Sequence, residues 1–98
     1  MTQEAANARV TVRIPTPLRG LTGGADTVHA SGATVGALIE ALDAQHPGLR
    51  ERVLDESGAL RRFVNVYVNG EDVRFLQGLE SSLPAGADVS IVPAVAGG

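Results

Sequence analysis

The sequence contains no cysteine, no tryptophan and no lysine. Without cysteine, the chain has no disulfide, no thiolate metal ligand and no cysteine nucleophile. All eight basic side chains are arginine, so no side-chain amine is available to attack an activated acyl group. We therefore expect no catalytic residue in the chain itself.

Aromatic residues and clustered positive charge are also scarce. The net charge is −3, and the arginines are scattered along the sequence. Basic stripes with stacking aromatics are absent, so we expect no nucleic-acid partner. His29 and His46 fall in different predicted elements and form no ligand spacing, so we expect no metal.

No apolar run reaches the roughly 20 residues that a membrane-spanning helix needs. Residues 1–8 lack the basic and apolar regions of a signal peptide, and we expect them to form a disordered lead. These features predict a cytoplasmic protein with no membrane partner.

Two strands are predicted near the N-terminus. Residues 9–14 alternate polar and apolar side chains, which is typical of a half-buried strand. Residues 15–24 are rich in proline and glycine and predict a turn-rich loop, in which Gly23 and Gly24 serve only turn chemistry. Residues 26–30 then predict a short strand, which we expect to be the return arm of a hairpin.

One amphipathic helix follows. Val35, Leu38 and Leu42 belong to an apolar stripe with helical spacing over residues 35–45. Thr34 is the predicted N-cap. The stripe needs a sheet to cover it, so we expect the helix to lie across one. Residues 49–61 then suggest a short helical turn and a loop.

The second half of the chain predicts a hairpin and a last strand. Residues 62–68 have the strongest strand pattern, and Asn69 with Gly70 is the signal of a type I′ turn into a strand at 71–75. After an irregular segment at 76–83, residues 88–92 form the last strand. Proline 93 cannot donate to a ladder, so we expect the chain to leave the sheet there.

The predicted order is β-β-α-β-β-β with one main helix packed on a mixed sheet. This is an α+β fold with the β-grasp arrangement of ubiquitin. The expected organisation is a single β-grasp domain over residues 9–92, followed by a flexible tail at 93–98. Fold alone does not determine function.

The tail is the most informative segment. Residues 93–98 have no charged side chain and end in two glycines, so that Gly98 presents a free carboxylate. A terminal diglycine also arises by chance in a glycine-rich chain, and a frayed end of no function is the alternative interpretation.

Four stretches together resemble the small sulfur carrier proteins of the MoaD/ThiS type. They are the end of the first strand with its loop at 14–24, the helix start at 34–38, the hairpin at 63–75 and the ending at 91–98. In the first stretch the likeness lies in residues 14–15, 18–19 and 22–24. The resemblance covers about residues 9–98. Within the family the likeness is greatest to the carriers that serve cysteine biosynthesis.

The resemblance implies a role for the tail. In this family a ubiquitin-activating-like, ATP-dependent enzyme adenylates the terminal glycine, and sulfur then replaces the adenylate to give a thiocarboxylate. By the same resemblance Gly98 carries the sulfur, and partners hold Gly97, Ala96 and Val95. No cofactor is bound, because ATP and the sulfur donor are used by the activating enzyme. The acceptor is a synthase, which is pyridoxal-phosphate-dependent in the cysteine branch.

The three aromatic residues suggest a docking patch. Phe63 and Tyr67, joined by Phe75, are expected on the sheet face away from the helix. A second small cluster covered by residues 76–83 is the alternative. The arginines that would ring such a patch are Arg61, Arg62 and Arg74.

Other functions remain open. A ubiquitin-like modifier would use the same activated Gly98 to form isopeptide bonds with target lysines. In the molybdopterin branch the carrier is itself the small subunit of a synthase. A β-grasp binding module with an incidental tail is the third alternative.

Overall fold

The computed structural model describes residues 9–93 and contains one five-stranded mixed sheet. Residues 1–8 and 94–98, including the predicted N-terminal lead, lie outside the described residues. The strands are β1 (Arg9–Arg13), β2 (Thr27–Ser31), β3 (Val64–Val68), β4 (Glu71–Asp72) and β5 (Asp88–Pro93). The helices are α2 (Val35–Gln45), α3 (Leu49–Val53) and the short 3-10 helices η1 (Thr16–Thr22), η2 (Val73–Phe75) and η3 (Gly78–Glu80).

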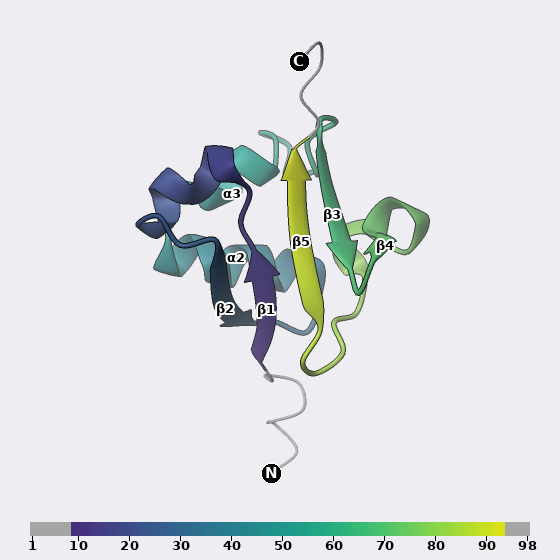
Figure 1. Ribbon diagram of the computed structural model, residues 1–98. Helices are drawn as coiled ribbons and strands as arrows, with labels where there is room; N and C mark the ends of the chain where they lie inside the picture. The colour runs from purple at the N-terminus through teal and green to yellow at the C-terminus, as the bar shows by residue number, and fades with distance from the viewer. Residues whose placement is uncertain (1–8, 94–98) are drawn as a thin grey trace.

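The strand order is β2-β1-β5-β3-β4, so the last strand of the chain lies at the centre of the sheet. It runs parallel to β1 and antiparallel to β3. Figure 1 shows the sheet with α2 behind it and the other face uncovered. The predicted β-grasp order, with one main helix on a mixed sheet, is confirmed.

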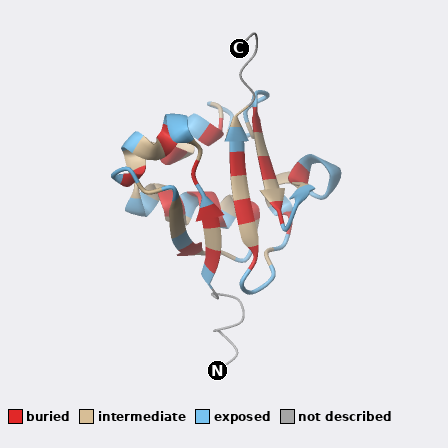
Figure 2. Cartoon of the chain, viewed as in Figure 1, coloured by how far each residue is buried: buried red, intermediate tan, exposed pale blue. Residues whose placement is uncertain are grey.

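Alternation along each strand separates the two faces. In β3, Val64, Val66 and Val68 are buried, whereas Asn65 and Tyr67 are only partly covered (Figure 2). The buried side chains face α2, whose apolar stripe is also almost fully buried. Full burial of one such side chain contributes about 1.5–3 kcal/mol. One core therefore fixes the helix on the sheet.

Local signals set the ends of α2 as predicted. The Thr34 hydroxyl accepts a hydrogen bond from the Ala37 N–H at 3.2 Å. The helix ends at Gln45, and Gly48 adopts a positive φ of 100° that reverses the chain into α3. The Asp43 carboxylate then accepts from the Gly48 and Arg50 N–H groups, each at 3.1 Å.

Several segments differ from the sequence prediction. The strand expected at 62–68 begins at Val64, because Arg62 and Phe63 form a turn in which the Val64 N–H donates to the Arg61 carbonyl at 3.0 Å. The loop at 15–24 contains η1, which Arg19 Nε stabilises by donating to the Ile14 carbonyl at 3.0 Å. The strand expected at 71–75 ends at Asp72, because the Asp72 carboxylate accepts from the Arg74 N–H and starts η2. Pro93 still belongs to β5. It is the last residue of the strand, so its missing N–H removes no hydrogen bond from a later residue of the strand.

Candidate functional site

The candidate site is the end of the sheet from which the tail continues. The residues with predicted roles in the tail, Val95, Ala96, Gly97 and Gly98, lie outside the described residues. The strand that leads to them is described, and Pro93 at its end lies opposite Val64 of β3. Neighbours on both sides and a buried inner face hold this strand in place.

The length of the tail limits where a partner can bind. Five residues follow Pro93. Fully extended, they span at most about 18 Å. Any protein that contacts Gly98 must therefore approach this end of the sheet, which lies at the top of Figure 1.

The structure exposes two of the three aromatic residues of the predicted docking patch. Phe63 immediately precedes β3 and is 55% exposed, and Phe75 ends η2 and is 86% exposed. Tyr67 is partly covered, opposite Ser90 of β5 on the face away from α2. The alternative in which residues 76–83 cover the aromatics is therefore wrong for Phe63 and Phe75.

The two phenylalanines do not share one pocket. Phe63 lines a pocket of about 370 Å³ with Asp55, Arg61, Arg62 and Val64. A separate pocket of about 490 Å³ contains Phe75, and its other lining residues are Leu76, Gln77, Ser81 and Ser82. Whether all three aromatics serve one docking surface stays a prediction.

Two of the predicted arginines lie near the start of β3. The Arg62 guanidinium carbon lies 5.8 Å from the centre of the Phe63 ring. Arg74 comes from η2, and its guanidinium donates to Asn65 Oδ1 and to the Arg61 carbonyl, each at 2.7 Å. These hydrogen bonds place a second positive charge next to the start of β3.

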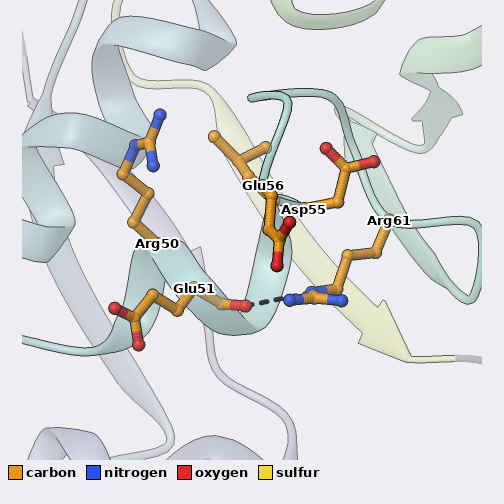
Figure 3. A pocket seen from close by; sticks show the side chains of 6 residues that line it. Arg50, Glu51, Asp55, Glu56 and Arg61 are labelled. Carbon is orange, nitrogen blue, oxygen red and sulfur yellow. Dashed lines mark hydrogen bonds between the residues drawn. The ribbon is translucent and has the colours of Figure 1, made fainter.

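Arg61 points to the other side, toward α3. Its Nε donates to the Glu51 carbonyl at 2.9 Å (Figure 3). The pocket drawn there has a volume of about 440 Å³ and contains Glu51, Asp55 and Glu56 besides Arg50 and Arg61. Three acidic residues therefore line the same pocket as Arg61.

Asp55 organises the loop that precedes Phe63. Its Oδ1 accepts from the Ser57 hydroxyl at 2.6 Å, from the Ser57 N–H at 2.9 Å and from the Ala59 N–H at 3.1 Å. These hydrogen bonds, the Ser57 hydroxyl first, lower the pKa of Asp55, and the charge of Arg61 adds to the effect. The loop therefore has a fixed turn at neutral pH.

Sequence reasoning missed two residues of this end of the sheet. Val92 is 42% exposed and lies opposite Asn65, which itself binds Arg74. The signal for Val92 was present, because Val89 and Ile91 alternate with it and are buried. The contact between Asn65 and Arg74 depends on how η2 folds back, and no local pattern indicates it.

Neither a metal centre nor a membrane span is found in the described part of the chain. Within residues 9–93, no three histidine, cysteine, aspartate or glutamate side chains gather closely enough to hold a metal ion. None of the helices over the same residues has the length and apolar character to cross a bilayer.

Comparison with known proteins identifies a family. A profile described as the ThiS family matches residues 12–98, which includes the whole tail. The sulfur carrier protein CysO of Mycobacterium tuberculosis (strain H37Rv) is 56% identical over 91 residues, which cover 91% of this chain and 98% of that protein.

Two solved structures extend the comparison. A chain in the crystal structure of the Amycolatopsis orientalis BexX/CysO complex is 52% identical, with a TM-score of 0.86, and the match covers 91% of this chain and 99% of that chain. SAMP1 of Haloferax volcanii, a small archaeal modifier protein, is 31% identical with a TM-score of 0.78. That match covers 93% of this chain and all of the other.

Proposed function

The chain belongs to the ThiS family and is a sulfur carrier protein rather than an enzyme, and from this premise we propose that it carries sulfur as a thiocarboxylate on Gly98. The observation that supports this site most strongly is the extent of the family match, which runs through the terminal diglycine. The site requires no catalytic side chain of the carrier, because partner enzymes supply the catalysis.

The chemistry requires activation of the terminal carboxyl group. A C-terminal carboxyl has a pKa of roughly 3.3–3.7, so at neutral pH it is ionised and a poor acyl donor. A partner enzyme joins a Gly98 carboxylate oxygen to the α-phosphate of ATP, and pyrophosphate leaves. A sulfur nucleophile then attacks the acyl carbon, the bond to the adenylate oxygen breaks, and AMP leaves. When hydrosulfide is the nucleophile, loss of the S–H proton gives the thiocarboxylate. When the donor is a persulfide, a thiol attacks the donor's sulfur in the acyl disulfide, so that the S–S bond breaks, a new disulfide forms and the thiocarboxylate leaves.

The sequence of the tail suits entry into a narrow active site. Among residues 94–98 the largest side chain is Val95, and the two glycines place no side chain beside the reacting carbon. The strand that precedes the tail is fixed at the centre of the sheet. A partner can therefore receive the tail while the folded body stays outside.

We propose two classes of partner. The first is a ubiquitin-activating-like enzyme that uses ATP and a sulfur donor. The second is a synthase that accepts the sulfur, and the identity to CysO supports a pyridoxal-phosphate-dependent enzyme that binds an activated serine and forms cysteine. The BexX/CysO complex is a precedent for a relative that binds a second protein.

Intact-mass spectrometry tests the proposal. The purified chain is incubated with ATP, a sulfur donor and the adenylating enzymes of its own organism, each in turn. We expect a mass gain equal to the exchange of one oxygen atom for sulfur, and no gain when ATP is omitted. Absence of the exchange with every such enzyme would refute the thiocarboxylate on Gly98.

A second candidate function is protein modification through Gly98. The likeness to SAMP1 favours it, because that protein is described as a modifier. Isopeptide-linked conjugates recovered from cells that express the chain would support this function. A population of free thiocarboxylate without conjugates would support the carrier function alone.

A further inference from the structure

The end of the sheet beside the tail has an unusual combination of exposed apolar and positively charged groups. We call this the tail-side surface, and it consists of Arg62, Phe63, Asn65, Arg74 and Val92. Arg62 packs over the Phe63 ring, Arg74 is hydrogen-bonded to Asn65, and Asn65 lies opposite Val92 in the sheet. Phe63 and Asn65 are two residues apart in the sequence, so both pairs lie at the start of β3.

Within residues 9–93, neither positively charged side chain of this surface forms an ion pair, although Asp55 lines the same pocket as Arg62 and Phe63. Arg74 donates only to neutral oxygens, and neither Arg62 nor Arg74 has a carboxylate oxygen of residues 9–93 within 4.0 Å. By contrast, Arg13 and Arg50 form ion pairs with Asp88 and Glu40. A guanidinium that is not engaged in such an ion pair is well suited to pair with a carboxylate on another protein.

The apolar part of the surface has the character of an interface centre. Phe63 and Val92 are among the few large hydrophobic residues that the described part of the chain exposes. Arginine and aromatic side chains together account for much of the binding energy at protein interfaces. The surface is also within reach of any protein that binds the tail, since Val64 follows Phe63 and lies opposite Pro93.

We propose that the tail-side surface docks onto an acidic patch of the activating enzyme, beside the slot that receives the tail. This rests on the proposed function, and it names the activating enzyme because no sulfur can be carried before that enzyme has acted. Phe63 occupies an apolar pocket of the enzyme, and Arg62 and Arg74 lie opposite carboxylates at its rim. The overall charge of −3 does not favour such an encounter, so the local charges must direct it.

Charge reversal with a matched control tests this surface. Arg62→Glu is compared with Arg9→Glu, because both residues are exposed and both changes alter the net charge equally. Arg9 starts β1, at the opposite end of the sheet from Pro93. The dissociation constant for the activating enzyme is measured without ATP, at low and at moderate salt, together with the melting temperature of each variant.

We expect Arg62→Glu to weaken binding at least about tenfold and to reduce its salt dependence, whereas Arg9→Glu changes binding less than about twofold. Equal effects of the two reversals, or no binding by the wild-type chain, would overturn the docking surface. Sulfur loading of the wild-type chain is measured separately. If binding depends on Arg62 but no sulfur is loaded, the assignment of Gly98 fails and the docking surface stands.

Discussion

Two regions of the molecule each expose a phenylalanine. One of these regions lies at the end of the sheet where β5 ends at Pro93. Phe75 is the more exposed, but it follows the edge strand β4, and its pocket contains no charged residue. Phe63 is less exposed, yet it directly precedes Val64, which lies opposite Pro93. The Arg62 guanidinium lies over the Phe63 ring. The proposed docking surface therefore rests on the position of Phe63 relative to the end of β5 and not on exposure alone.

The largest effect is expected from shortening the tail, because the tail is proposed to carry the reacting group and neither phenylalanine region does. Deletion of Gly97 and Gly98 should abolish sulfur loading completely, because the acyl carbon of the carrier is lost. The melting temperature should not change, since the core lies within residues 9–93. Binding to the activating enzyme should persist through the tail-side surface. Intact-mass spectrometry, thermal unfolding and a binding titration measure the three quantities.

The internal diglycine provides a matched control for this deletion. Gly23 has a φ of 67°, so Gly23→Ala should destabilise the fold by about 1 kcal/mol. Sulfur loading at saturating enzyme should remain at the wild-type level. Loss of loading by Gly23→Ala in a folded protein would contradict the assignment of the chemistry to the terminal pair.

The next effect compares the two phenylalanines directly. Phe63→Ala should weaken binding to the activating enzyme about tenfold, as expected for an aromatic residue at an interface centre. Phe75→Ala should leave the dissociation constant unchanged if the two pockets are independent. An equal loss for both variants would instead show that all the aromatics serve one docking patch, as the sequence suggested.

A smaller effect is expected from releasing Arg74. Asn65→Ala removes one of the two oxygens that hold its guanidinium. Binding should weaken by about two- to tenfold, because a mobile side chain must be ordered again on association. An unchanged dissociation constant, with an unchanged melting temperature, would show that Arg74 does not contact the enzyme.

The smallest effect is expected on the melting temperature at acidic pH, and it involves Asp55 in the loop that precedes Phe63. The pKa of Asp55 is lowered in the folded state, so its contribution to stability is complete above the unfolded value of about 3.9 and is lost as the pH falls through the folded value. The melting temperature of Asp55→Asn should therefore fall less steeply than that of the wild type below about pH 4. Parallel curves for the two proteins would contradict this role of Asp55.

Local patterns predicted the regular elements of the fold. The N-cap Thr34 directly precedes the residues of α2 that carry the apolar spacing. The turn at Asn69 and Gly70 needs only two neighbouring residues with positive φ values, which are 51° and 87°. The 3-10 helices were missed because single side-chain hydrogen bonds, such as that of Arg19 to Ile14, stabilise them. Such contacts leave no periodic pattern in the sequence.

The candidate site was predictable only in part. Gly98 follows from its place at the end of the chain and from the family resemblance. The tail-side surface needs the sheet register that brings Val92 opposite Asn65 and the return of η2 that brings Arg74 to the same place. Neither is a local property of the sequence, so the predicted aromatic patch and the proposed tail-side surface share Phe63 and differ at Phe75 and Val92.

The position of the sulfur atom tests the central claim most directly. After incubation with ATP, the activating enzyme and a sulfur donor, the chain is fragmented in a tandem mass spectrometer, and the added mass is assigned to a fragment. Sulfur confined to the C-terminal fragments that contain Gly98 is the predicted result. Sulfur elsewhere in the chain, or its absence from those fragments, would contradict the claim.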